Sequence, residues 1–447
     1  MNSTDGATAP AAFHSHRGIP LLGLIPASRV AEVVLELALR AAMDTAYLSF
    51  VSLYGGFEVN VDGLKMAESL LATLLLAAVL PRRFNKPSDV LLAIFFLVPV
   101  LPILSYYALS GQSRTYFYAV VVSFAIVDIA RHLPIPTPPA LKGVWKAVVG
   151  GSLFLSLGVA AWLYRAGGAQ LLNLDITRVY DFRQAYNTEV SVGLFSYISR
   201  WTYKVLNVLL MGWSLFQRWY AVFIGLALLQ VFFFAVSSHK QLLVFPLLVL
   251  FLYVTVRKRT AVFWLIGGML AVVLLGLLVH WAGGPSIIPG LVIRRLLYLP
   301  AELEFLYFDF FSANGFVYMT NSSEFSWLGE YSYNKPPPLL ISDAAGLYGA
   351  WANAGFLASS YMNFGVSGMF VTSGLVGILL SICDRLSVGR LPVWLALCIV
   401  IVPFTSLFVS SDLLTALIGH GLLLSLLVLW LVNARPRPVS IRVTGRS

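Results

Sequence analysis

The sequence predicts an all-α polytopic membrane protein that forms one integral membrane domain over residues 1–447. Three observations lead to this fold class. Hydrophobic residues make up 59% of the chain and charged residues only 11%, and the mean hydropathy is +0.83, which is outside the range of soluble globular proteins. The apolar runs are close to the roughly 20 residues that a helix needs to cross a bilayer. They are continuous, whereas the strands of a transmembrane barrel would alternate.

The apolar runs predict about 12 transmembrane helices, with no removable signal peptide in the first 29 residues. In chain order the predicted spans are 30–53, 64–80, 88–109, 115–131, 145–164, 201–216, 219–236, 241–256, 261–281, 352–382, 391–409 and 412–432.

The basic residues predict the orientation of the chain. If both termini are cytoplasmic, the basic clusters all fall in cytoplasmic segments, as the positive-inside rule requires. The net charge of +10 is therefore explained without nucleic acid, because no basic stripe with interleaved aromatic residues is present. The clusters are Arg82, Arg83 and Lys86; Arg131, Lys142 and Lys146; Arg257, Lys258 and Arg259; Arg385 and Arg390; Arg435, Arg437, Arg442 and Arg446.

Two long connections, 165–200 and 282–351, fall on the outer face in this orientation. Long connections in a compact protein are usually functional, so we expect the site there. Within the second, 291–311 is too charged to span a membrane and predicts one or two interfacial helices broken near Pro300. The segment NKPPPLL, 334–340, predicts a stiff polyproline spacer.

Arginines in the two outer loops are the first candidates for binding an anionic substrate. The planar guanidinium group holds phosphate oxygens through paired hydrogen bonds, and arginine is costly beside lipid. Arg178 and Arg183 in the first loop, with Arg294 and Arg295 in the second, can together clamp a diphosphate. The alternative is that they reach lipid headgroups or pair with loop carboxylates.

Further basic residues flank the predicted spans. Arg200 and Lys204 are four residues apart and share one helix face at the outer start of the sixth span, where they either extend the clamp or anchor the helix. His239 and Lys240, in SSHK at 237–240, contact a substrate carboxylate or phosphate, donate a proton in catalysis, or form a tight outer turn from which the lysine reaches the interface.

Several carboxylates are candidates for a general base, and their spacing does not choose among them. No HExxH motif, paired cysteine ligands, P-loop or nucleotide-binding glycine pattern occurs in the sequence, so we expect no metal and no cofactor. The candidates are Asp181, Glu189, Glu302, Glu304, Asp309 and Glu324.

The first span contains an ionisable row with a four-residue repeat: Glu32, Glu36, Arg40 and Asp44. Such residues face the bundle interior or a wet cavity. A Glu36–Arg40 ion pair, an amphipathic segment on the inner surface and a proton path are the three interpretations of this row.

Small residues in the last third predict packing. Cys383 and Cys398 lie in apolar runs, and we expect them to pack as small apolar residues without a disulfide. The pairs Gly365 with Gly368 and Gly374 with Gly377 favour close helix contacts.

The layout as a whole resembles the O-antigen polymerase family, the Wzy-type oligosaccharide repeat-unit polymerases of bacterial envelopes. The resemblance lies in the span number, in the large arginine-containing outer loops, and in four strings. These are VYDFRQAYN at 179–187, GLFSYISRWTYKVLN at 193–207, SSHKQLLVFPLLVLFL at 237–252 and YMNFGVSGMFVTSGLVGILLSICDR at 361–385.

The resemblance implies a bacterial inner-membrane enzyme with a fold similar to the type C glycosyltransferases. Its substrates would be glycans on undecaprenyl diphosphate, a growing chain would pass to a new lipid-linked unit, and a chain-length regulator is a candidate partner. Arg178, Asp181 and Arg183 would then be catalytic. The substrate-binding candidates are Tyr180, Tyr186, Arg200, Lys204, His239, Lys240, Arg294, Arg295, Glu302 and Asp309.

Two other functions remain open at this stage. An O-antigen ligase shares the same overall plan, although the loop between the first two spans is short and holds only Glu58 and Asp62 as acidic residues. A lipid-linked glycan flippase or transporter would also suit twelve spans, but the two halves show no convincing repeat.

Overall fold

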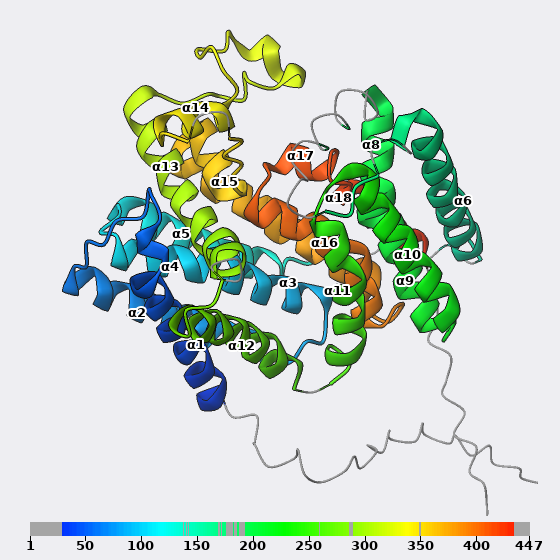
Figure 1. Cartoon of the computed structure of the whole chain (residues 1–447), viewed down its shortest axis with the longest axis horizontal. Helices are drawn as coiled ribbons and strands as arrows, with labels where there is room; N and C mark the ends of the chain where they lie inside the picture. Colours follow the sequence, from blue (N-terminus) through cyan, green and yellow to red (C-terminus); the bar gives the residue numbers. More distant parts are fainter. Residues whose placement is uncertain are drawn as a thin grey trace, which may run out of the picture.

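The computed structural model of the chain describes residues 29–432. Within that range it does not cover 137, 140, 142, 169, 171, 176–181, 183–185, 187–192, 259, 286–288 and 348–349. The described residues form helices and connecting segments, and no β-strand occurs among them, so the predicted all-α class is confirmed for this part of the chain (Figure 1).

Six helical stretches are long and apolar enough to cross a membrane, which identifies a membrane-embedded protein. They are Pro87–Leu109, Trp145–Gly168, Tyr220–Ser237, Ala261–Trp281, Phe356–Ser387 and Leu413–Leu431. The other six predicted spans coincide with helices that are shorter or more charged, so the count of twelve crossings stays a prediction.

In the first half of the chain, the helices up to residue 130 lie toward one side of the bundle in Figure 1, and those between residues 145 and 216 lie toward the other. The helices are α1 (Arg29–Ser49), η2 (Val51–Leu53), α2 (Gly63–Val79), α3 (Pro87–Phe95), η3 (Phe96–Val100), α4 (Leu101–Leu109), α5 (Arg114–Ala130), α6 (Trp145–Leu163) and η4 (Tyr164–Gly168). After the partly described connection come α8 (Gly193–Trp201), η6 (Thr202–Leu206) and α9 (Asn207–Phe216).

The second half of the chain completes the helical bundle. Its helices are α10 (Tyr220–Ser237), α11 (Gln241–Thr255), α12 (Ala261–Trp281), η7 (Pro289–Tyr298), α13 (Leu299–Asn314), η8 (Ser323–Leu328) and α14 (Pro337–Ala344). They are followed by α15 (Phe356–Ser387), α16 (Val393–Val409), α17 (Leu413–Leu417) and α18 (Leu422–Leu431). We call the end of the bundle that carries η7, α13 and α14 the loop end.

Helix α15 is central and packs along α5. A Cβ atom on Gly377 would lie 2.5 Å from Ala130 Cβ and 2.7 Å from the Val127 carbonyl oxygen, which confirms the predicted close contact at this glycine. Gly365 has a different role, because it has φ of 62° and breaks α15 together with Phe364. The two cysteines are buried thiols, as expected.

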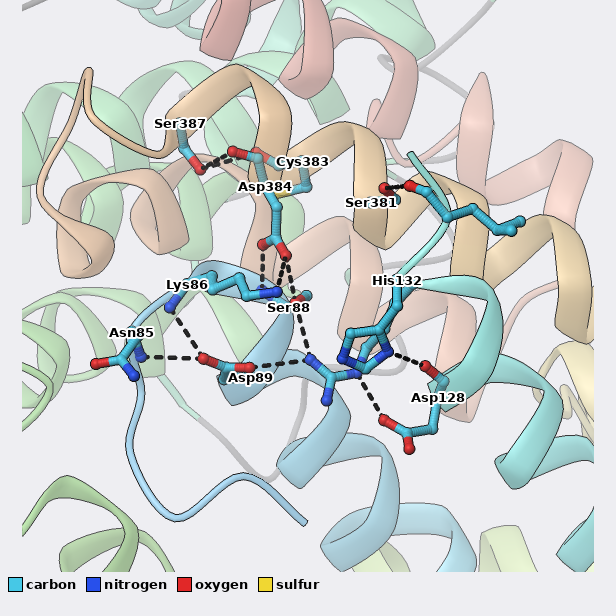
Figure 2. Close-up of polar contacts among 12 residues, drawn as sticks. Asn85, Lys86, Ser88, Asp89, Asp128, His132, Ser381, Cys383, Asp384 and Ser387 are labelled. Atoms are coloured by element: carbon cyan, nitrogen blue, oxygen red, sulfur yellow. Dashed lines mark hydrogen bonds and ion pairs between the residues drawn. The ribbon is translucent and has the colours of Figure 1, made fainter. Parts of the chain in front are cut away.

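A polar network ties together the start of α3, the end of α5 and the end of α15 (Figure 2). Arg131 donates to Asp89 at 2.9 Å and to Asp128 at 2.7 Å, and also to the Ser88 hydroxyl at 3.2 Å. Asp384 accepts from the Ser88 hydroxyl at 2.6 Å and its backbone N–H at 2.9 Å. Arg131 is therefore a buried, ion-paired residue, and not only a charge that sets orientation.

The ionisable row of α1 faces the protein, since Glu32, Glu36 and Arg40 are all buried. The predicted Glu36–Arg40 pair is wrong: Arg40 Nε donates to Asp44 at 2.7 Å, and its Nη1 donates to Thr73 at 3.1 Å. Asp44 also accepts from Ser105 of α4. The row therefore joins α1 to α2 and α4, and an interior position replaces the surface interpretation.

The segment 291–311 is helical as predicted, with a change of helix type at Tyr298 and Leu299, next to Pro300. Helix α13 packs against α15, α4 and η7, so many of its side chains are buried. The polyproline prediction for 334–340 is wrong from Pro337 onward, where α14 begins. Proline fits the first turn of a helix because its missing N–H would have no intrahelical partner there.

Candidate functional site

The three residues predicted to be catalytic, Arg178, Asp181 and Arg183, lie outside the described residues, as does Tyr180. Tyr186 is described, and its ring is buried with an edge toward His239 at a centroid distance of 6.2 Å. One residue of the first long connection therefore reaches the turn after α10.

His239 and Lys240 follow Ser238, which ends α10 in a left-handed conformation. The His239 Nδ1 atom lies 2.8 Å from the Ser237 carbonyl oxygen, and its ring is 6.3 Å from that of Tyr203 in η6. Both His239 and Lys240 are partly buried. The predicted tight turn is present, and it brings His239 to η6.

Lys204 is the most deeply buried of the basic site candidates that the structure describes, with 5% of its surface exposed. It lies in the π-helical segment η6, and its Nζ atom is 2.8 Å from His420 Nδ1. π-Helical turns often mark functional positions because they interrupt regular packing. Among the described residues, no carboxylate lies within 4.0 Å of the Lys204 ammonium group.

Arg200 lies one turn before Lys204, at the end of α8. Its guanidinium group donates to the Ser196 carbonyl and hydroxyl oxygens, each at 2.9 Å, and stacks 4.9 Å from the centre of the Tyr197 ring. No carboxylate in the described part of the chain pairs with it either. We name Arg200, Lys204 and His420 the cationic cluster.

His420 was not predicted as a site residue, because it lies in an apolar run that predicts an unbroken span. The structure breaks this span between α17 and α18, at residues 418–421. Gly421 has φ of 79°, and Trp201 Nε1 donates to the Ile418 carbonyl oxygen at 2.6 Å. The signal available in the sequence is IGHG, in which two glycines flank a histidine. In Figure 1, α17 lies between α15 and α8.

An interrupted helix is expected where a membrane protein binds a polar ligand. Irregular backbone at membrane depth is tolerated when it is buried in protein or lines a wet cavity. Here two irregular segments meet, η6 and 418–421, and each presents a basic side chain to the other. Buried cations that pair with no carboxylate among the described residues favour an anion as ligand, because an unpaired buried charge is unstable.

The predicted residues of the second loop form a separate group. Arg294 places its guanidinium group 4.4 Å from the centre of the Tyr54 ring, while Arg295 is exposed. Glu302 is 5% exposed, and a Cβ atom on Gly56 would lie 2.5 Å from its Oε1 atom. Burial raises the pKa of Glu302 to about 7, opposed by the nearby charge of Arg294.

The structure distinguishes among the candidate bases. Glu304 accepts from the Tyr116 hydroxyl and from the backbone N–H groups of Gly355 and Ala358, so it caps the start of α15. Burial raises the pKa of Glu304 to about 7 against these hydrogen bonds. Glu302 has no hydrogen bond or ion pair within the described part of the chain, which leaves it chemically available, and Asp309 is exposed.

The other candidate bases, Asp181, Glu189 and the side chain of Glu324, lie outside the described residues.

No group of three or more His, Cys, Asp or Glu side chains in the described part of the chain is placed to hold a metal ion. Comparison of the sequence and structure with protein-family models, curated proteins and solved structures found no match.

Proposed function

We propose that this protein polymerises oligosaccharide repeat units carried on undecaprenyl diphosphate, at the outer face of a bacterial inner membrane. The proposal includes twelve spans, both termini in the cytoplasm, and the loop end facing outward. It agrees with the resemblance of the sequence to the Wzy-type polymerases. A ligase-like transferase and a flippase are the alternatives to be excluded by experiment.

The observation that carries the proposal is the cationic cluster. Lys204 is buried beside His420, near Arg200, and no carboxylate of the described residues balances them. The leaving group of such a polymerase is a lipid diphosphate, whose negative charge grows as its bond to the sugar breaks. Fixed cations at the membrane boundary stabilise that charge.

The reaction joins two sugars. A hydroxyl oxygen of the new unit attacks C1 of the first sugar of the growing chain, and the bond between C1 and the phosphate oxygen breaks with its electron pair leaving on the diphosphate. The hydroxyl proton passes to a base, for which Asp181 remains a candidate and Glu302 is available. Arg178 and Arg183 would contribute to holding the diphosphate or the sugars.

A gel of surface glycans from the native host, with and without the gene, tests the function. We expect deletion to remove the polymer ladder and to leave core glycan carrying a single repeat unit. Loss of that single unit as well would contradict polymerisation and indicate a flippase or ligase. Polymer accumulating on its lipid carrier would then identify a ligase.

Complementation tests the residues. We expect Lys204→Ala and Arg183→Ala to fail to restore the ladder at wild-type protein level. Lys258→Ala is the matched control, because Lys258 is exposed near the opposite end of the bundle. A normal ladder from Lys204→Ala would remove the cationic cluster from the reaction.

A further inference from the structure

The contact between Lys204 and His420 restricts how many protons the two side chains hold. A lysine ammonium group has only donors, and a doubly protonated histidine has a donor on each ring nitrogen. The 2.8 Å separation between Lys204 Nζ and His420 Nδ1 is a hydrogen bond only if one nitrogen offers a lone pair. The pair in this arrangement therefore holds one proton fewer than two charged side chains.

The surroundings of the pair disfavour a second positive charge on it. The helices packed most closely against η6 are α6, α8, α9 and α16, and the ring of His239 lies 6.3 Å from that of Tyr203 in η6. Of these, α9 and α16 contain no ionisable Asp, Glu, His, Lys or Arg, α6 has only Lys146 in its first turn, and α8 adds the positive charge of Arg200. Asp412 is engaged in capping α17 through the Thr415 N–H at 2.9 Å. A second positive charge beside Lys204 would thus be repelled.

A bound phosphate group would reverse this balance. Its oxygens accept hydrogen bonds from both nitrogens, and its negative charge offsets two cations and Arg200. His420 is in the break at 418–421 and Lys204 is in the π-helical segment η6, so the two side chains can separate without disrupting a regular helix.

We propose that the Lys204–His420 pair takes up one proton from solution when a phosphate or diphosphate group binds between the two side chains. The proton joins His420 Nδ1, and the N–H···N hydrogen bond is replaced by two N–H···O bonds to the ligand. This inference rests on the proposed function, which supplies the diphosphate ligand, and it adds a proton to the binding of that ligand. The chemistry itself is shared by a lipid-linked diphosphate and a free one.

Calorimetry of the detergent-solubilised full chain tests the proposal. Inorganic pyrophosphate and farnesyl diphosphate are titrated separately at pH 8 in buffers of different ionisation enthalpy, such as Tris and MOPS. The slope of the apparent binding enthalpy against buffer enthalpy counts the protons taken up. We expect about one proton for the wild-type protein from the linkage of proton and ligand binding.

Two variants make the test specific. His420→Asn keeps a hydrogen-bond acceptor for Lys204 but does not titrate, so we expect binding to persist with a slope near zero. His132→Asn is the control, because His132 is exposed at the opposite end and its Nδ1 contacts the Asp128 carbonyl oxygen. It should keep the wild-type slope.

The outcomes separate the inference from the function. Wild-type binding with no proton uptake would overturn the inference while leaving the proposed polymerase intact, and absence of binding by both probes would overturn the inference and the anion site together. Uptake with both probes supports the inference for any diphosphate, whereas uptake with farnesyl diphosphate alone supports it for a lipid-linked one. Whether the chain polymerises glycans is decided independently by the surface-glycan gel.

Discussion

Lys204→Met is the most informative single substitution, because its effect on stability has a different sign for a structural lysine and for a ligand-binding one. If Lys204 were one half of a buried ion pair, removing it would strand a carboxylate and cost about 3–5 kcal/mol. The structure instead puts the ammonium group beside His420 and near Arg200, with no carboxylate partner among the described residues.

The expected change follows from two terms. The lost hydrogen bond to His420 costs about 1 kcal/mol. Methionine of similar length fills the same space, and removing a buried charge recovers desolvation free energy that is of the same size or larger. We therefore expect Lys204→Met to unfold with a free energy no more than about 1 kcal/mol below that of the wild type, and this free energy can exceed the wild-type value. Chain polymerisation should nevertheless be lost.

The assay is the unfolding midpoint of purified protein in mixed micelles with a rising fraction of denaturing detergent. Arg131→Met is the matched control, since Arg131 is also buried but pairs with Asp89 and Asp128. It should lose about 3–5 kcal/mol. A loss for Lys204→Met as large as that for Arg131→Met would refute our interpretation of Lys204 as an uncompensated cation.

Three further predictions concern packing, pH and the helix break. Gly377→Ala should lower the free energy of unfolding by about 1–3 kcal/mol, because the new Cβ would lie 2.5 Å from Ala130 Cβ. Gly374→Ala should be neutral or stabilising, since its new Cβ would have its nearest neighbour at 3.9 Å. Equal unfolding midpoints for the two variants would contradict the close α5–α15 contact. Burial raises the pKa of Glu302 from 4.5 to about 7, so only the folded chain keeps this proton between those values, and stability should fall by about 3 kcal/mol as pH rises through that window. Glu302→Gln should remove this loss of stability. If the unfolding midpoints of Glu302→Gln and the wild type change equally between pH 5 and pH 8, Glu302 is not the titrating group. Gly421→Ala should lose more stability than Gly389→Ala, since both have positive φ but only a Cβ at 421 meets Trp201, at 2.9 Å; thermal unfolding of the two variants compares them, and matching losses would mean that the Trp201 contact has no energetic weight.

Most of the helical fold could be predicted from the sequence, because continuous apolar runs leave a chain in lipid few alternatives to helix. Each predicted span overlaps helical residues, and residues 291–311 are helical as predicted. What the sequence did not reveal depends on neighbours. Pro337 starts a helix because the first turn of a helix needs no N–H from it. Arg40 pairs with Asp44, which also accepts from Ser105 of α4, and this contact between helices is not visible in the sequence.

The candidate site was predicted only in part. Lys204 and Arg200 were identified from their spacing, and the structure adds that Lys204 is buried. His420 was missed, because hydropathy averages over a whole span and cannot register that two glycines interrupt it. Glu302 and Glu304 were indistinguishable in sequence, since only the fold decides which one meets the backbone N–H groups that begin α15.

The network around Arg131 affects how activity screens of this chain should be interpreted. A survey that replaced each arginine and scored only the glycan product would count Arg131 beside Arg200, since a chain that fails to fold makes no product. Measured protein level would separate the two, because the ion pair of Arg131 with Asp89 holds α5 to α3, and neither helix contributes to the cationic cluster. Loss of product alone therefore does not identify a substrate ligand among the arginines of this protein.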